Sequence, residues 1–125
     1  MFKAIVFDHD WDSLQITLEL MKNNRYLTSV IGFSTPQALF NELEKGNIDI
    51  AFIRVGKPGI SGLSLVRKIQ QRLPAVRLVF MADTRNYAVM AFEEGACGYL
   101  ILPIRTEYLT EVIENILQRR RWKGG

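Results

Sequence analysis

Short, almost continuously apolar runs alternate along this chain with longer segments whose apolar residues recur at helical spacing. Runs of the first kind are typical of strands that helices cover on both faces. They predict strands over 2–7, 26–33, 48–54, 76–81 and 98–102. The segments between them predict helices over 11–24, 36–45, 62–72, 84–94 and 105–121. Thr35 followed by Pro36 is typical of a helix start, and Gly46 of a helix end.

Five strand–helix units in a chain of this length predict an α/β domain. Right-handed crossovers between successive strands give a parallel sheet. The natural solution is a flavodoxin-like, doubly wound five-stranded sheet, (βα)5, with strand order 2-1-3-4-5. Functional groups in such sheets gather outside the carboxyl ends of the first and third strands. Here those ends carry Asp8, His9 and Asp10 on one strand and Arg54 on the other.

The composition excludes several classes of protein. With 125 residues and 48% hydrophobic content, the chain is one ordinary domain with a substantial core. No apolar run approaches the roughly 20 residues of a membrane-spanning helix, and no signal-peptide pattern precedes the first strand. Cys97, the single cysteine, excludes a disulfide framework and fits a reducing cytoplasm. Since His9 is the only histidine and no dinucleotide fingerprint or Ser/His/Asp set is present, we expect no zinc site, no cofactor and no classical enzyme.

The net charge of +3 originates at the end of the chain. Arg119, Arg120, Arg121 and Lys123 supply four positive charges, and the remainder has 12 basic and 13 acidic residues. The basic character therefore belongs to a tail or linker start over 119–125, after a domain over 1–118. A phosphate-contacting arm is the alternative interpretation of this tail. Direct contact between nucleic acid and the domain itself is not expected.

Four motifs follow one another in a recognisable order. They are the acidic strand end VFDHD at 6–10, the loop KPGISGL at 57–63, the segment NYAVMAFEEGA at 86–96 and the strand with a proline turn GYLILPI at 98–104. Together they resemble a response regulator receiver domain over about residues 2–118. The Tyr-Ala and Ala-Phe pairs of 86–96 resemble receivers found upstream of LytTR-type DNA-binding domains.

The resemblance implies a phosphorylation pocket whose usual groups are mostly replaced in this chain. In the family, two acids after the first strand and an acceptor aspartate at the end of the third gather Mg²⁺. Here Asp8 matches the first acid, and His9 stands where the second belongs. Asp10 is one place further on, and Arg54 replaces the acceptor.

Two further positions depart from the family pattern. Ala82 stands where a Thr or Ser hydroxyl would bind the phosphoryl group, and Leu102 stands where a lysine would pair with it. Because phosphoryl transfer depends on positioning and charge stabilisation, these changes predict a degenerate receiver, or pseudo-receiver, without metal, catalytic residue or ordinary phosphorylation. A working switch that uses Asp8, Asp10 or Asp83 as its acceptor is the alternative.

Three roles are open to Arg54. It is a passive replacement whose head group reaches solvent, or it pairs with Asp8, Asp10 or both in the space that Mg²⁺ would occupy. The second role is favoured by the planar fork of the guanidinium, which suits carboxylates. In the third role, Arg54 and Lys57 capture a small anion, and the pocket is then a ligand sensor.

Tyr99 matches the aromatic residue that, in the family, turns inward when the Thr or Ser hydroxyl is drawn to phosphate. Without that hydroxyl we expect Tyr99 to be fixed packing. The Leu102–Pro103 bond is expected to be cis, as is frequent in the family. The resemblance also implies a homodimer through the predicted helix over 84–94, strand over 98–102 and helix over 105–121. The expected interface members are Arg85, Tyr87, Tyr99, Arg105 and Tyr108.

The sequence thus predicts a cytoplasmic, phosphorylation-independent regulatory and protein-interaction module of the two-component type. We expect it to belong to a longer transcription regulator whose downstream output domain binds DNA.

Overall fold

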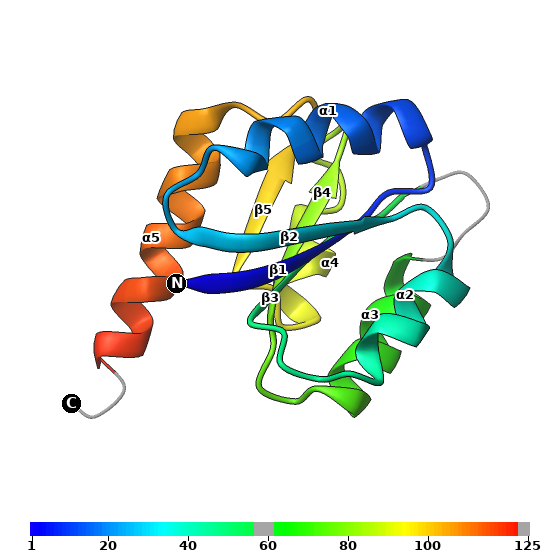
Figure 1. Ribbon diagram of the computed structural model, residues 1–125. Coiled ribbons are helices and arrows are strands. Elements are labelled where there is room, and N and C mark those ends of the chain that lie inside the picture. Colours follow the sequence, from blue (N-terminus) through cyan, green and yellow to red (C-terminus); the bar gives the residue numbers. More distant parts are fainter. Residues whose placement is uncertain (57–61, 123–125) are drawn as a thin grey trace.

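The computed structural model describes residues 1–56 and 62–122. Five strands alternate with five helices along this part of the chain (Figure 1). Each predicted boundary lies within two residues of the observed one, except the start of the fourth helix. The elements are β1 (Phe2–Phe7), α1 (Trp11–Lys22), β2 (Leu27–Phe33), α2 (Pro36–Leu43), β3 (Ile50–Arg54), α3 (Gly62–Arg72), β4 (Arg77–Ala82), α4 (Ala88–Glu93), β5 (Gly98–Ile101) and α5 (Thr106–Trp122).

The strands form one parallel sheet in the order β2-β1-β3-β4-β5, which confirms the predicted topology. β1 and β3 are neighbours at the centre, with Phe7 paired to Ile53. β4 lies on the other side of β3, where Arg54 pairs with Met81. The carboxyl ends of these three strands therefore meet at one edge of the sheet.

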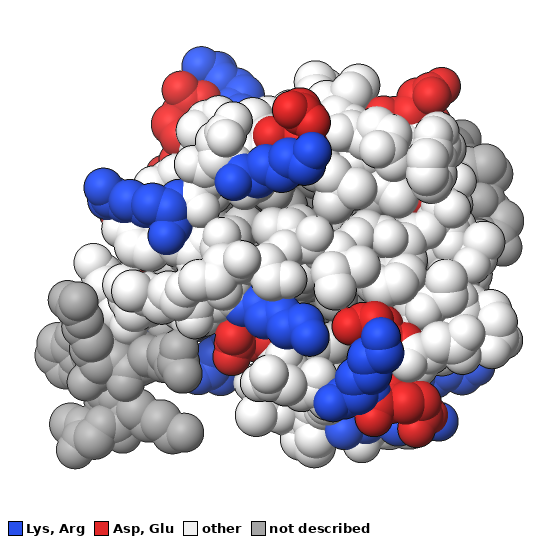
Figure 2. Space-filling model, in the orientation of Figure 1, with Lys and Arg blue, Asp and Glu red and all other residues white. Residues whose placement is uncertain are grey.

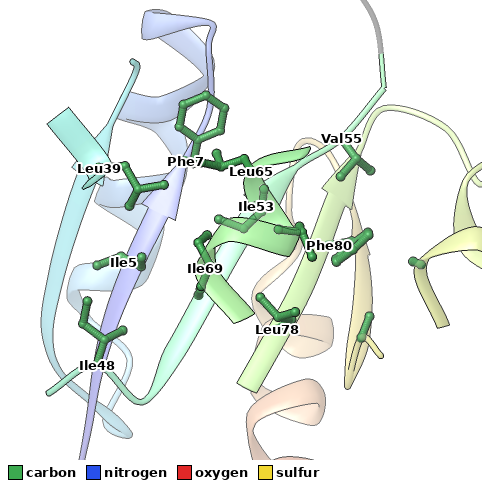
Figure 3. Close-up of a cluster of buried hydrophobic side chains, with 14 of the residues drawn as sticks. Ile5, Phe7, Leu39, Ile48, Ile53, Val55, Leu65, Ile69, Leu78 and Phe80 are labelled. Carbon is green, nitrogen blue, oxygen red and sulfur yellow. The ribbon is translucent and has the colours of Figure 1, made fainter. Parts of the chain in front are cut away.

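Helices cover both faces of the sheet, which explains why its strands are almost continuously apolar. On one face, Leu39 of α2, Ile69 of α3 and Ala91 of α4 pack against alternate strand residues such as Phe80. Figure 3 shows part of this first core cluster, in which side chains of the helices meet those of the strands. On the other face, α1 and α5 pack against the remaining strand residues to form a second core cluster.

Local sequence signals set several helix ends. The Thr35 hydroxyl accepts a hydrogen bond from the Ala38 amide, and Pro36 occupies the first turn of α2, as predicted. α2 ends at Leu43, ahead of Gly46, which adopts a positive φ of 67° in the following turn.

The predicted helix over 84–94 is too long, because α4 begins only at Ala88. In the preceding segment the Asn86 amide donates to the Thr84 hydroxyl, and the Ala88 amide donates to the Arg85 carbonyl. A side-chain hydrogen bond such as that of the Thr84 hydroxyl competes with the helical pattern. Residues 83–87 therefore form a turn, hereafter the 83–87 turn.

The surface carries both signs of charge. Figure 2 shows basic and acidic side chains interspersed on the face that it presents. α5 continues to Trp122, so the basic segment begins inside this helix, and a separate tail over 119–125 stays a prediction. Within the described residues, no helix is long and apolar enough to cross a membrane.

Candidate functional site

The site lies where β1 and β3 end side by side. Asp8 directly follows β1, and its backbone amide donates to the Phe33 carbonyl at the end of β2. Arg54 is the last residue of β3. Because β1 and β3 are parallel neighbours, the two side chains emerge at the same edge of the sheet.

Asp8 and Arg54 form a buried ion pair. The Asp8 side chain has no exposed surface, and only 14% of the Arg54 side chain is exposed. Arg54 Nη1 donates to both carboxylate oxygens of Asp8, at 3.2 Å to Oδ1 and 3.3 Å to Oδ2. The Asp10 amide donates to the same Oδ1 at 2.9 Å. The buried Asp8 carboxylate thus has a neighbouring cation and an amide as partners, as burial of a carboxylate requires.

A second acid, Asp83, lies at the outer side of Arg54. Its Oδ2 is 3.9 Å from Arg54 Nη2, and 73% of its side chain is exposed. A contact this long and exposed adds little to stability. The sequence indicates Asp83 only as an alternative acceptor, and its position beside Arg54 was not predicted. The predicted strand order already places Asp83 near Arg54, because Asp83 follows β4 and β4 is the neighbour of β3.

The prediction left open whether Arg54 pairs with Asp8, with Asp10 or with both, and it pairs with Asp8. Asp10 is exposed, and its carboxylate accepts the Ser13 amide at 3.1 Å as the N-cap of α1. The extended backbone of Asp10 suits this capping position. His9 lies between the two acids and is partly exposed. Lys57, proposed for anion capture, lies outside the described residues.

This arrangement does not fit the Mg²⁺ ion that the resemblance implies. Mg²⁺ needs free oxygen ligands in near-octahedral geometry. Both oxygens of Asp8 already accept hydrogen bonds from Arg54, whose positive charge lies beside them. Among the described residues, no three His, Cys, Asp or Glu side chains are placed to hold a metal ion together.

Ala82 and Leu102 lie near the pocket without adding a polar side chain to it. Ala82 ends β4 and is buried in the first core cluster. Leu102 packs against the second core cluster, and its amide donates to the Ala82 carbonyl at 2.8 Å. The peptide bond between Leu102 and Pro103 is cis, as predicted.

Tyr99 of β5 is held at both ends of its side chain. The ring packs against the first core cluster, and the hydroxyl donates to the Thr84 carbonyl at 2.5 Å. Burial raises the pKa of Tyr99 above its ordinary value of 10.0. The hydroxyl therefore keeps its proton and its hydrogen bond at neutral pH.

Three more of the predicted interface residues, Arg85, Arg105 and Tyr108, join Tyr99 around a surface hollow of about 570 Å³ between α4 and α5. The Arg105 guanidinium contacts the Tyr108 ring at 5.4 Å and pairs with Glu107. Tyr87 is not part of this lining.

Tyr87 instead packs against Gly56, just beyond the end of β3. A β-carbon added to Gly56 would lie 2.8 Å from Tyr87 Cε2, so the ring leaves no room for a side chain there. Three exposed apolar residues were not predicted as interface members: Val89 and Phe92 on α4, and Ile101 on β5, which lines the hollow. Helical spacing does mark Val89 and Phe92 as one face of α4, but it does not tell which face is exposed.

Comparison with known proteins gives one consistent family. The family model described as "Response regulator receiver domain" matches residues 4–114. A response regulatory protein of Vibrio cholerae is 25% identical over 122 residues, which cover 97% of this chain and 51% of that protein. A two-component response regulator of Arabidopsis thaliana is also 25% identical, over 94% of this chain and 31% of its own length. The chain thus spans about half or less of these relatives.

Solved structures agree on the fold. The receiver domain of a response regulator from Clostridium thermocellum superposes with a TM-score of 0.79 at 24% identity, and 98% of each chain is covered. The response regulatory domain of protein mrkE from Klebsiella pneumoniae gives a TM-score of 0.77 at 20% identity, with 98% and 99% covered.

Proposed function

Because this chain belongs to the family of response regulator receiver domains, we propose that it is a receiver that acts without phosphorylation, as a regulatory and protein-interaction module rather than an enzyme. One observation carries the proposal. The buried Asp8–Arg54 pair fills the acceptor position with a cation and engages both oxygens of the remaining family acid.

The chemistry of the pocket supports this proposal. Arginine has no carboxylate to form an aspartyl phosphate, and its charge persists at any physiological pH. Phosphoryl transfer also relies on groups that stabilise the charge of the transferred phosphoryl. At the two positions where the family pattern has a hydroxyl and a lysine, Ala82 and Leu102 supply neither.

The test is treatment of the chain with acetyl phosphate and Mg²⁺, followed by intact mass spectrometry. We expect the wild-type mass to stay unchanged. An Arg54→Asp variant, treated in parallel, reports whether the remaining pocket supports modification once a carboxylate is restored. A gain of one phosphoryl group by the wild type would overturn the proposal. Peptide mapping would then assign the group to Asp8, Asp10 or Asp83.

We further propose that the partner is a second copy of this chain, bound through α4, β5 and α5. Val89, Phe92, Ile101 and Tyr108 are large apolar side chains exposed on these elements. Clusters of exposed apolar residues rimmed by polar ones are typical of interaction surfaces. Arginine and tyrosine around the neighbouring hollow suit the same role, since both are enriched at interfaces.

Sedimentation velocity over a concentration series tests the dimer. We expect the wild type to dimerise in the absence of any phosphoryl donor, and Ile101→Glu to weaken dimerisation at least about ten-fold, because it places a charge at a desolvated contact. Ile16→Glu is the control, since Ile16 is also an exposed isoleucine, with 62% exposed against 37% for Ile101, but lies on α1. A wild type that stays monomeric up to about 100 μM, or two variants that behave alike, would count against this surface.

The whole protein is proposed to be a cytoplasmic transcription regulator with a DNA-binding output domain. The Tyr87-Ala88 and Ala91-Phe92 pairs around α4, which resemble receivers of LytTR-type regulators, support this proposal. Joining the receiver to candidate output domains and measuring DNA binding of wild type and Ile101→Glu would test it. If the wild type and Ile101→Glu bound DNA equally well, DNA binding would not depend on the dimer surface.

A further inference from the structure

β2 forms one edge of the sheet. Within the described part of the chain its only strand neighbour is β1, and β5 forms the opposite edge. α1 and α2 contact β2 from the two faces of the sheet, and Figure 1 shows β2 running between them at the front of the view. Every residue over 29–33 is partly exposed. The outer side of β2 is therefore within reach of another strand.

Two residues of β2 turn their backbone groups to this outer side. The Phe33 carbonyl accepts a hydrogen bond from the Asp8 amide, so the backbone of Phe33 faces β1. Successive residues of a strand turn their N–H and C=O groups to opposite sides, so Ile31 also faces β1 while Val30 and Gly32 face outward. Among the described residues, no hydrogen bond outside the sheet involves the backbone of Val30 or Gly32. Two amides and two carbonyls are thus available to a neighbouring strand.

β2 lacks the features that usually protect an edge strand. Such strands commonly carry charged residues or proline, or they bulge away from a partner. The sequence of β2 is LTSVIGF, without charge or proline, and the one irregularity in its pairing with β1 lies at its start, at Thr28. Figure 2 shows the strip of surface along β2 without charged side chains, with both signs of charge above and below it. The regular part of the strand is therefore open to pairing.

Ile31 lies at the centre of this regular part. Its neighbours pack inward, Val30 against the second core cluster and Phe33 against the first. Ile31 is partly exposed and, as far as the described residues go, belongs to neither cluster. A strand that paired with β2 would cover this apolar side chain.

We propose that β2 pairs with β2 of a second copy, antiparallel and about a two-fold axis at Ile31, so that the two sheets join into one. In this register Val30 of each copy lies opposite Gly32 of the other, and their outward amides and carbonyls bond to one another. The two Ile31 side chains meet at the axis. The inference goes beyond the proposed function, since it needs neither the altered pocket nor the α4–β5–α5 surface.

Two properties of β2 favour a second copy over another partner. Val30 and Gly32 lie on the same face, since Val30 packs against the second core cluster and a β-carbon on Gly32 would lie 2.6 Å from Leu18 of α1. The register thus places a residue without a side chain opposite each valine, which leaves room for the valine. The strand also carries no charge, so no like charges oppose one another across the axis, and an acidic or basic segment finds no counterpart.

Amide hydrogen exchange followed by NMR tests the pairing, in an Ile101→Glu background that removes the other proposed surface. The Val30 and Gly32 amides face outward, so a partner strand is what protects them. A contact this small is expected to be weak. With a dissociation constant of about 0.1 mM, exchange at these two amides should slow about three-fold between about 50 μM and about 1 mM protein. The Ile31 and Phe33 amides face β1 and should change little.

A pair of charge variants, made in the same background, tests the two-fold axis itself. Ile31→Lys and Ile31→Glu each place like charges face to face at the axis, and each should weaken association about five-fold or more in sedimentation velocity. An equimolar mixture of the two should recover association, because lysine then meets glutamate. Ile16→Lys and Ile16→Glu are the controls, since Ile16 is an exposed isoleucine on α1, and they should leave association unchanged.

Exchange at Val30 and Gly32 that does not depend on protein concentration would overturn the pairing, and it is the result expected if some other strand covers β2. A mixture that associates no better than either Ile31 variant alone would overturn the two-fold register. The exchange measurement needs no substitution in β2, so it decides the question even if a charge at Ile31 unfolds the domain.

Discussion

Replacing Arg54 by methionine removes the cation from beside a carboxylate that has no exposed surface. Methionine retains most of the length and apolar character of the side chain, so the change is mainly one of charge and hydrogen bonding. Asp8 would keep its bond from the Asp10 amide but lose both bonds from Arg54. The variant thus isolates the cost of leaving a buried carboxylate without its counterion.

The magnitude follows from burial. Removal of one partner from a buried ion pair generally costs about 3–5 kcal/mol, because the other charge stays desolvated. Arg54 is 14% exposed, so water can approach the space it leaves and lower the cost. We therefore expect the free energy of unfolding to fall by about 2–4 kcal/mol. A domain of ordinary stability, about 5–15 kcal/mol, survives such a loss and stays folded.

Urea denaturation followed by circular dichroism measures this difference. With an m-value of about 2 kcal/mol per molar, the middle of the usual range, the midpoint should fall by roughly 1–2 M at an unchanged slope. The Asp8→Asn, Arg54→Met double variant should lose less than Arg54→Met alone, because no buried charge is then left unpaired. Arg67→Met should change stability by less than about 1 kcal/mol, since its pair with Glu94 is exposed.

A loss within about 0.5 kcal/mol for Arg54→Met would refute the reasoning, because changes of that size are typical of ordinary surface substitutions. A double variant that is less stable than Arg54→Met would also contradict it, since the unpaired charge would then not be the source of the loss.

Three other substitutions test separate parts of the fold by the same urea assay. Thr35→Ala removes the N-cap of α2 and should cost about 1 kcal/mol; no loss would mean that the hydroxyl does not cap the helix in solution. Gly98→Ala places a methyl group 2.8 Å from Val112 Cγ1 and should cost about 1–3 kcal/mol, because a β-branched side chain cannot easily turn away. The raised pKa of Tyr99 means that the folded state holds this proton more tightly than the unfolded state. Its contribution is complete below about pH 10 and is lost as the pH rises through the folded-state pKa. Tyr99→Phe should therefore show a smaller fall in stability than the wild type as the pH is raised above about 10.

The sequence was sufficient to predict the fold because several independent signals agreed. Almost continuously apolar runs mark the strands, and the helical segments between them require parallel pairing. The error at α4 has a local cause. The apolar residues after Asn86 have helical spacing, and the hydrogen bonds that keep 83–87 out of the helix depend on side-chain rotamers.

The candidate site was predictable only in part. Parallel strands bring their carboxyl ends together, so the meeting of Asp8 and Arg54 follows from the topology. The role of Asp10 as the N-cap of α1 does not follow from the topology, because a carboxylate after a strand can equally bind a cation or cap the next helix. The extended backbone of Asp10 decides between these two uses.

The largely buried guanidinium of Arg54 has a consequence for how signals reach this domain. A chelator cannot remove this positive charge, and an arginine has no carboxylate that could become an aspartyl phosphate. A chemical signal of those kinds leaves the pocket as it is. If the domain acts without phosphorylation, as proposed, control would pass to how much of the protein the cell makes and to the molecules that compete for its surface.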